Sequence, residues 1–381
     1  MTKKQKIGII YFDERHIIPH FITVVKELFL SNHFEVEILT YQAQHSYLYE
    51  LLEKNNLPKT LVKQLPTYRY RKISEKIKGR KIPSPLYLFK KHKELLLSYD
   101  ALIFNDINHE YLYSKRQGKS PKFVLLMHGA GDREYLIAKK YEDTVSKFDL
   151  VSASGQKVFQ YFEKMNLPNT KVVICGYQKF DLIDSSKKIS FFNNDKQIVL
   201  YNPHFSRDLS SWYKYGLDIL AFFYQNKQYN LIFAPHINLF NKKGFLKSDI
   251  IPQKYFEADN IHIDLGSKHS VNMDYTLSAD IYLGDVSSQI YEFLYKPRPS
   301  IFINAHGIDW QNNPHYKNWY LGKVIEDISN LEQLLSTAGQ WQKKFIKKQE
   351  EMMEFTFENN QKNTASACIV KAIDESLTKS I

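Results

Sequence analysis

Lys6-Ile-Gly-Ile-Ile-Tyr-Phe12 is the short apolar run that decides the fold, because it has the length and composition of a buried β-strand. Residues 17–30 follow, with apolar side chains that recur at the three- and four-residue spacing of a helix. A second strand is predicted at Glu35-Val-Glu-Ile-Leu-Thr-Tyr41. Strand, helix and strand in close succession predict a parallel βαβ unit, the building block of an α/β fold.

The same alternation continues along the chain, and a polar stretch at residues 184–196 interrupts it once. Before that stretch the predicted strands are Asp100–Phe104, Lys122–Met127, Phe148–Ser152 and Lys171–Cys175. After it they are Gln197–Tyr201, Asn230–Ala234, Ile261–Asp264, Asp280–Leu283 and Ser300–Asn304, with helices predicted at 217–224, at 289–295 and over most of 331–381.

Two successive Rossmann-like halves followed by C-terminal helices indicate the GT-B architecture, in which two domains face each other across a cleft. We place the domains at residues 1–186 and 197–381 and assign the helical tail to the second. Parallel α/β sheets bind ligands at the carboxyl ends of their strands. The polar residues that directly follow strands are therefore the candidates for a functional site.

The composition indicates a globular protein of a reducing compartment. The chain has 381 residues with 43% hydrophobic content, which is enough for two cores. Its two cysteines, Cys175 and Cys368, have no metal-ligand spacing. The apolar run at residues 7–12 is too short for a signal peptide, and no apolar run is long enough to span a bilayer. We therefore expect a cytoplasmic protein.

The formal net charge of +11 is concentrated in one segment, which we call the basic segment, residues 69–93. Its basic residues are Arg69, Arg71, Lys72, Lys76, Lys78, Arg80, Lys81, Lys90, Lys91 and Lys93. Aromatic and aliphatic residues are interleaved with them, a pattern that suits an anionic membrane surface. A solvated loop is an equally open interpretation. Nucleic acid is disfavoured, because no zinc-finger or RNP-like motif accompanies the charge.

Two candidate motifs follow strands of the first half. His128 and Gly129 come directly after the strand that ends at Met127, where an imidazole could take up a proton near neutral pH. Tyr177 and Asp181 follow the next strand but one, near the domain boundary, and we predict that they line the cleft or form a hinge. A structural turn is the alternative interpretation of each motif.

Three candidate motifs follow strands of the second half. The first contains Tyr201, Asn202, Ser206 and Arg207, and its arginine could hold a phosphate. The second is His236, at the tip of the strand that ends at Ala234, where an imidazole could stabilise negative charge. In both motifs, a packed structural role is the alternative.

The third motif is the turn Gly284-Asp285-Val286-Ser287-Ser288, which precedes the helix predicted at 289–295. Ser287 and Ser288 stand where a helix N-cap belongs, so backbone N–H groups and hydroxyls there could bind a phosphate. Glu292, one turn further on, could reach a ribose or a serine hydroxyl. Plain N-capping is the alternative.

Taken in order, these motifs resemble those of the CDP-glycerol glycerophosphotransferase family, the teichoic-acid-type polymerases and primases. That family carries His-Gly-Thr, Gly-Tyr-Pro-Arg-x-Asp, Tyr-x-Pro-Thr-x-Arg, a His-Pro strand tip, and Asp-Tyr-Ser-Ser before Lys-Pro. The matching residues here are His128-Gly129, Gly176-Tyr177 with Asp181, Tyr201 and Pro203 with Arg207, His236, and Asp285 with Ser287-Ser288 before Lys296-Pro297. The departures include Ala130, Gln178-Lys179-Phe180, His204, Ile237 and Val286, and they bear on the donor and acceptor more than on the fold.

The resemblance implies transfer of glycerol phosphate, or a similar polyol phosphate, from a CDP-linked donor to a hydroxyl of a cell-surface glycan or lipid-linked acceptor. This would serve capsule or teichoic-acid-like polymer synthesis, on the inner face of the cytoplasmic membrane. His128 would be the general base. His236 would be the second catalytic residue, which holds the pyrophosphate and offsets charge on the leaving CMP. The donor-binding residues would be Ser206, Arg207, Gly284, Asp285, Ser287, Ser288 and Glu292, and the cleft-lining residues Gly129, Tyr177, Asp181, Tyr201 and Asn202. We expect no cofactor, and a divalent cation is not indicated.

Three other functions stay open at this point. The first is a GT-B glycosyltransferase that uses a CMP- or UDP-sugar. The second is a nucleotide-sugar 2-epimerase, which would act on a donor without an acceptor. The third is a non-catalytic membrane-surface protein of a polysaccharide export system, which the basic segment would suit.

Overall fold

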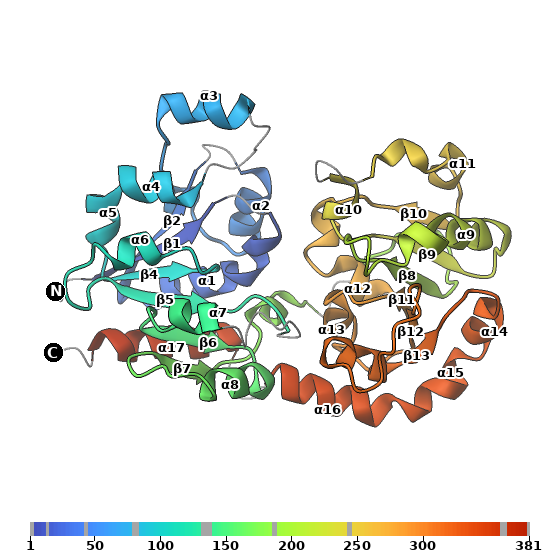
Figure 1. Ribbon diagram of the computed structural model, residues 1–381. Coiled ribbons are helices and arrows are strands. Elements are labelled where there is room, and N and C mark those ends of the chain that lie inside the picture. The colour runs from blue at the N-terminus through green and yellow to red at the C-terminus, as the bar shows by residue number, and fades with distance from the viewer. Residues whose placement is uncertain are drawn as a thin grey trace. The chain divides into compact units, whose positions relative to one another are not determined.

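The computed structural model describes residues 4–12, 15–41, 45–77, 84–130, 139–184, 189–241, 246–358 and 364–378. The chain divides into two compact units. Unit 1 comprises Met1–Ile183 together with Phe355–Ile381, and unit 2 comprises Asp184–Glu354. Each unit is built around one parallel β-sheet with helices packed against it, as Figure 1 shows. The prediction of two Rossmann-like halves is confirmed.

The sheet of unit 1 has the strand order β3-β2-β1-β4-β5-β6-β7, and every pairing is parallel. Its strands are β1 (Gln5–Tyr11), β2 (Phe34–Thr40), β3 (Val62–Gln64), β4 (Ala101–Phe104), β5 (Lys122–Leu126), β6 (Leu150–Ala153) and β7 (Lys171–Ile174). Ile7 pairs with Val36 on one side and Ala101 on the other, so β1 is central. This position explains why its apolar run is buried on both faces.

The helices of unit 1 are α1 (Ile22–Leu30), α2 (Ser46–Lys54), α3 (Arg69–Ile77), α4 (Pro85–Lys91), α5 (Lys93–Leu97), α6 (Glu110–Tyr113), α7 (Lys139–Val145), α8 (Gln156–Glu163) and α17 (Ala365–Thr378), with 3-10 segments η1 (Arg15–His20), η2 (Lys59–Leu61) and η4 (Gln178–Leu182). The single helix predicted at residues 17–30 is therefore two segments, η1 and α1. Pro19 lies inside η1 and has no N–H to donate, so the regular helix begins only at Ile22.

The last helix, α17, belongs to unit 1, whereas the sequence had assigned the whole tail to the second domain. It contacts α1, β5 and β6, and it buries Ile369, Ala372 and Ile373. Asp181 caps it, because its carboxylate accepts hydrogen bonds from the N–H groups of Ala365 at 3.2 Å and Ser366 at 2.8 Å. Burial of this apolar face is the physical reason that the chain returns to the first sheet.

The sheet of unit 2 has the strand order β10-β9-β8-β11-β12-β13, again entirely parallel. Its strands are β8 (Ile198–Asn202), β9 (Asn230–Phe233), β10 (Ile261–Ile263), β11 (Ile281–Gly284), β12 (Ser300–Ile303) and β13 (Lys323–Ile325). Its core includes Val199, Leu231, Phe233, Ile281 and Leu283 from the sheet, against Ile219 and Phe223 of α9 (Trp212–Gln225).

The remaining helices of unit 2 are α10 (Asn238–Asn241), α11 (Gln253–Phe256), α12 (Asp274–Ser278), α13 (Gln289–Phe293), α14 (Leu331–Ser336), α15 (Ala338–Trp341) and α16 (Ile346–Thr356), which extends into unit 1, with 3-10 segments η5 (Ser248–Ile250), η6 (Lys268–Ser270), η7 (Pro314–Leu321) and η8 (Gln342–Lys344). The helix predicted at 289–295 thus ends at Phe293. Among the described residues, no helix is long and apolar enough to cross a membrane.

Candidate functional site

The carboxyl edge of the unit 2 sheet has a topological switch point between β8 and β11, the central strands from which the sheet grows in opposite directions. At this point the N–H of His204 donates to Oδ1 of Asp285 at 2.9 Å. The N–H and the hydroxyl of Ser211 donate to Oδ2 of Asp285 at 2.8 Å and 3.0 Å. The loop after β8 and the turn after β11 are therefore fixed against each other.

Asp285 organises this edge from inside the protein. Its side chain is fully buried, and Val286 adds a fourth hydrogen bond to its carboxylate at 2.8 Å. Burial raises the pKa of Asp285 to about 6, although the hydrogen bonds from Ser211 and His204 act in the opposite direction. Both carboxylate oxygens of Asp285 accept hydrogen bonds from the protein. Asp285 therefore supports the two loops, whereas the sequence analysis had assigned it to binding the donor substrate.

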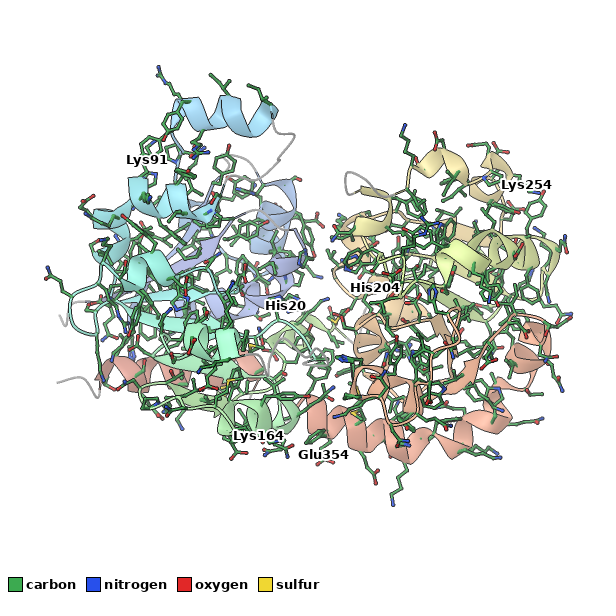
Figure 2. All side chains as sticks on the ribbon, in the orientation of Figure 1. His20, Lys91, Lys164, His204, Lys254 and Glu354 are labelled. Carbon is green, nitrogen blue, oxygen red and sulfur yellow. The ribbon has the colours of Figure 1, made fainter. Side chains whose placement is uncertain are left out.

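Two histidines stand together at this edge. The ring centroids of His204, labelled in Figure 2, and His236 are 5.7 Å apart, and Phe205 lies 4.5 Å from His236. Nδ1 of His204 accepts the N–H of Ser206 at 3.0 Å, and Nδ1 of His236 accepts the N–H of Asn238 at 3.2 Å. In a neutral imidazole these bonds place the hydrogen on Nε2. Each ring can therefore donate a hydrogen bond from Nε2.

The turn after β11 is shaped by its serines. Ser287 is buried, and its hydroxyl oxygen accepts the N–H of Gln289 at 3.4 Å. The N-cap residue of α13 is Ser288, whose side chain makes no capping hydrogen bond. Ser288 is exposed and remains accessible. Gly284 is required at the end of β11, because a Cβ there would lie 2.6 Å from the hydroxyl oxygen of Tyr282. Since α13 has only five residues, its dipole contributes less than the predicted longer helix would.

The other predicted residues of unit 2 divide into supporting and surface groups. Tyr201 and Asn202 are fully buried. The Tyr201 hydroxyl lies 3.1 Å from that of Ser211, so Tyr201 supports the loop instead of lining a cleft. Arg207 is exposed, with its guanidinium 5.6 Å from the ring of Tyr213. Ser206 is half-buried, and Glu292 is buried on α13.

The sequence did not single out a further polar cluster at the same edge, in the loop after β10. Asp264 accepts hydrogen bonds from the hydroxyls of Ser270 at 2.9 Å and Tyr275 at 2.8 Å. Nδ1 of His269 lies 2.6 Å from the carboxylate of Asp274. The loop is tied to α13, because the side chain of Gln289 donates to the carbonyl of Ser270 at 3.2 Å. Asp264 directly follows a strand, so the strand-end rule applied there could have found this cluster.

Unit 1 gathers histidines at the carboxyl edge of its own sheet. His128 is exposed after β5, and its ring centroid is 5.9 Å from that of His20. The ring of His20 is in turn 5.5 Å from Tyr177. Burial, and then the charge of Lys179, lowers the pKa of His16 to about 4 and that of His20 well below its usual value. Both imidazoles are therefore neutral near pH 7.

The segment after β7 is held against the end of β5. The side chain of Gln178 donates to the carbonyl of Met127 at 3.0 Å, and the hydroxyl of Thr23 donates to the carbonyl of Gln178 at 3.1 Å. Tyr177 stacks on Phe357 with ring centroids 4.5 Å apart. Asp181 caps α17. Gly129 is half-buried at the end of the described part of its loop, which stops at Ala130.

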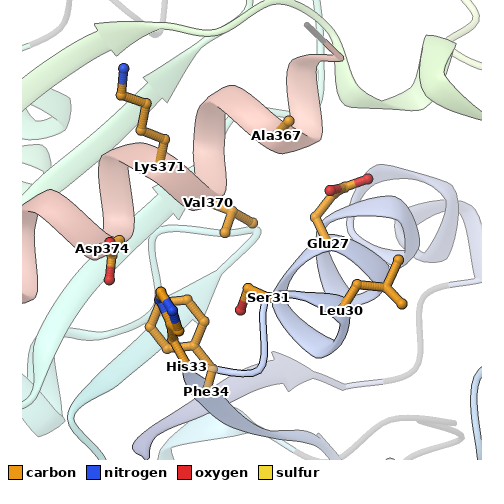
Figure 3. Close-up of a pocket in the computed structure, with 9 residues that line it drawn as sticks. All are labelled: Glu27, Leu30, Ser31, His33, Phe34, Ala367, Val370, Lys371 and Asp374. Carbon is orange, nitrogen blue, oxygen red and sulfur yellow. The ribbon is translucent and has the colours of Figure 1, made fainter.

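A hollow in unit 1 lies at the opposite edge of the sheet (Figure 3). It has a volume of about 370 Å³ between α1 and α17, and Glu27, His33, Lys371 and Asp374 contribute its charged and ionisable side chains. Since β2 begins beside it at Phe34, it lies at the amino ends of the strands, where α/β sheets do not place their ligands. In the described ranges, no three His, Cys, Asp or Glu side chains are grouped to hold a metal ion.

Comparison with solved structures returns the same fold. The wall teichoic acid polymerase TagF superposes with a TM-score of 0.65 at 16% identity, over 99% of this chain and 90% of that one. MnaA of S. aureus, solved with UDP, superposes with a TM-score of 0.62 at 12% identity, over 99% of this chain and 97% of MnaA. UDP-GlcNAc 2-epimerase from Neisseria meningitidis, bound to UDP-GlcNAc, superposes with a TM-score of 0.55 at 14% identity, over 99% of this chain and 100% of the epimerase. No protein-family model matches the chain, and no curated protein matches its sequence.

Proposed function

We propose that the protein transfers glycerol phosphate, or a similar polyol phosphate, from a CDP-linked donor to a hydroxyl of a cell-surface glycan or lipid-linked acceptor. The activity would serve synthesis of a capsule or teichoic-acid-like polymer at the inner face of the cytoplasmic membrane. The observation that carries the proposal is the switch point of unit 2, where Asp285 holds the His204 loop beside the 284–288 turn. TagF, solved after a soak with CDPG, shares the fold.

In the proposed reaction, the oxygen of the acceptor hydroxyl forms a bond to the phosphorus that carries glycerol. The bond from that phosphorus to CMP breaks, and CMP leaves with the electron pair. His128 takes the hydroxyl proton. In phosphoryl-type transfer, positioning and neutralisation of charge supply most of the rate enhancement, so the donor-binding groups of unit 2 are as important as the base.

The geometry of unit 2 suits a pyrophosphate. His236 presents an Nε2 donor because its Nδ1 is occupied by Asn238, and His204 beside it is held in the same tautomer. Arg207 and Ser288 are exposed near the same strand ends, where they could add a positive charge and a hydroxyl donor. Together these groups supply charge-assisted hydrogen bonds of the kind that stabilise phosphate oxygens.

The direct test is a transfer assay with radiolabelled CDP-glycerol and a lipid-linked acceptor. Replacing His128→Ala should lower kcat by about 10²–10⁴, the usual contribution of a general base. The matched control is His33→Ala at the amino edge of the same unit, which should leave kcat unchanged. A His128→Ala enzyme within a few-fold of wild type would show that His128 is not the base.

A second candidate is an enzyme that uses a CMP- or UDP-sugar. The observation in its favour is that proteins solved with UDP and with UDP-GlcNAc share the fold. Thermal stabilisation by CDP-glycerol, CDP-ribitol, CMP-sugars and UDP-sugars separates the candidates, because a ligand at 100 times its Kd adds about 2.7 kcal/mol. Stabilisation by UDP-sugars alone would overturn the CDP-linked donor, and product formed without any acceptor would indicate an epimerase.

A further inference from the structure

The two cysteines of the chain meet at the end of β7, although they are far apart in the sequence. Sγ of Cys368, on α17, lies 3.7 Å from the carbonyl oxygen of Ile174, the residue that precedes Cys175. On the other side of Cys175, a Cβ built on Gly176 would lie 3.4 Å from Cβ of Ala365, which is one turn before Cys368 on α17. Both neighbours of Cys175 therefore face the part of α17 that carries Cys368.

Both cysteines are free thiols, and their side chains are hydrogen-bonded to each other. Cys175 is buried, whereas Cys368 is half-buried. The hydrogen bond from Cys175 lowers the pKa of the Cys368 thiol, although burial opposes it, and the charge of Lys371 acts in the same direction as the hydrogen bond. The same contact, together with burial, raises the pKa of Cys175. The thiolate form is therefore favoured at Cys368, the more accessible of the two sulfurs.

The backbone on each side of the pair is held in place. The N–H of Cys175 donates to the carbonyl of Ala153 on β6 at 3.0 Å, and the cap from Asp181 fixes the first turn of α17. The two sulfurs therefore stay close together throughout the native state. Cysteines that respond to oxidants combine thiolate character, access to solvent and a second thiol within reach. Cys368 has the first two properties, and Cys175 supplies the third.

We propose that Cys175 and Cys368 are a reversible oxidation site, which forms an intramolecular disulfide when the protein meets a hydroperoxide. The Cys368 thiolate attacks one peroxide oxygen, the O–O bond breaks, and the departing hydroxide takes up a proton to become water. This leaves a sulfenic acid on Cys368. The sulfur of Cys175 then attacks the Cys368 sulfur and loses its proton, and the S–O bond breaks to release a second water. Two thiols and one hydrogen peroxide thus give one disulfide and two waters.

The disulfide would join β7 to the helix that closes unit 1. Unit 2 lies in the sequence between the two cysteines, so the bond would close a loop of chain that contains the whole of unit 2. A cross-link over so long a loop restricts the unfolded chain more than the folded one. Oxidation is therefore expected to raise the melting temperature of the protein by at least about 4 °C.

The test is to treat the full-length reduced protein with a small molar excess of hydrogen peroxide, unfold it, and alkylate it with N-ethylmaleimide. The chain has only two cysteines, so intact-mass measurement reads both at once. The reduced protein should take up two alkyl groups and the oxidised protein none, while it remains a monomer on a non-reducing gel. Dithiothreitol should restore both thiols. Oxidised protein that still takes up two groups, or that is linked between chains, would overturn the proposal.

Two matched variants separate the roles of the sulfurs. Cys175→Ser should stop at the sulfenic acid of Cys368, which dimedone traps, because the second thiol is missing. Cys368→Ser should leave Cys175 as an unreacted thiol that is alkylated only after unfolding. Dimedone labelling of Cys175 in the Cys368→Ser variant at the rate seen for Cys368 would contradict the assigned order. A melting temperature of wild type that does not rise on oxidation would show that the native contact does not accommodate the bond. None of these readouts depends on transferase activity.

Discussion

The backbone nitrogen of His204 lies 2.9 Å from Oδ1 of Asp285, just beyond the carboxyl ends of β8 and β11, the two paired strands at the centre of the unit 2 sheet. This hydrogen bond joins residues 81 positions apart in the sequence. Through it, and through Ser211 on the other carboxylate oxygen, one buried acid determines the positions of two loops. The His204 loop therefore owes its position to a residue whose carboxylate accepts hydrogen bonds from the protein itself.

Asp285→Asn should therefore lower both stability and donor binding. The amide nitrogen would face an N–H donor that it cannot pair with, and such a mismatch in a buried network costs about 1–3 kcal/mol or more. Thermal denaturation and titration with CDP-glycerol would measure the two effects. Asp208→Asn, at an exposed carboxylate in the same loop, is the control. If the Asp285→Asn variant had the same melting temperature as wild type, Asp285 would not have the supporting role.

His236 offers a prediction about its two nitrogens. His236→Gln keeps a donor near the position of Nε2, whereas His236→Asn keeps an acceptor near that of Nδ1, which accepts from Asn238. If Nε2 donates to the pyrophosphate in the transition state, the glutamine variant should retain at least about tenfold more kcat than the asparagine variant. Loss of kcat of the order of 10²–10³ is expected for His236→Ala. Equal rates for glutamine and asparagine would remove Nε2 from the mechanism.

His109 makes unit 1 sensitive to acid. It is fully buried among aromatic rings, 3.7 Å from the centroid of Phe148, and neither ring nitrogen has a hydrogen-bond partner in the described part of the chain. Burial lowers the pKa of His109 to about 3. Because this is below the value in the unfolded chain, the unfolded state binds the proton first, and stability falls as pH decreases from about 6.5 towards 3.

The corresponding variant is His109→Leu, which removes the titrating group at similar volume. Between pH 7 and pH 5, wild type should lose about 2 kcal/mol relative to this variant, as linkage requires for such a shift. In a unit of this size that corresponds to roughly 4–8 °C in melting temperature. Parallel melting curves for the two proteins across this pH range would show that His109 does not titrate on unfolding.

Gly155 is predicted to be intolerant of a side chain. A Cβ there would lie 2.5 Å from the carbonyl oxygen of Thr356, where Glu358 donates to the carbonyl of Ser154 at 3.1 Å. Gly155→Ala should destabilise unit 1 by about 1–3 kcal/mol through overpacking. Gly339→Ala, with no atom within 4 Å of its Cβ, is the control and should be neutral or stabilising. Equal melting temperatures for both variants would show that the contact can relax.

Periodicity in the sequence was enough to predict both sheets, because buried parallel strands are continuous apolar runs such as residues 6–12. It missed β3 and β13, which have three residues each and only half-buried patterns. It also merged η1 with α1, since apolar spacing continues through Pro19. The assignment of the tail failed because the sequence shows that a helix has an apolar face and does not show which sheet that face covers.

For the candidate site, the sequence likewise predicted the positions of residues but not their contacts. The strand-end rule correctly placed His128, His236 and the 284–288 turn at the carboxyl ends of strands, because it needs only strand positions. It could not distinguish Asp285, whose carboxylate accepts hydrogen bonds from the protein, from Ser288, which is exposed to solvent. That distinction depends on contacts between residues far apart in the sequence. The polar cluster of Asp264 and the His269–Asp274 pair was missed because the predicted strand included Asp264, whereas β10 ends at Ile263.

The cap that Asp181 places on α17 joins residues 184 positions apart. During synthesis on the ribosome, the first sheet is complete as a sequence long before the helix that covers α1 has been translated. Unit 2, by contrast, is one continuous segment, residues 184–354. All its strands have therefore been synthesised by the time its last residue leaves the ribosome. Since domains fold as units while the chain grows, the second sheet can reach its final state before the first. Unit 1 is therefore complete only after the whole of unit 2 has been synthesised.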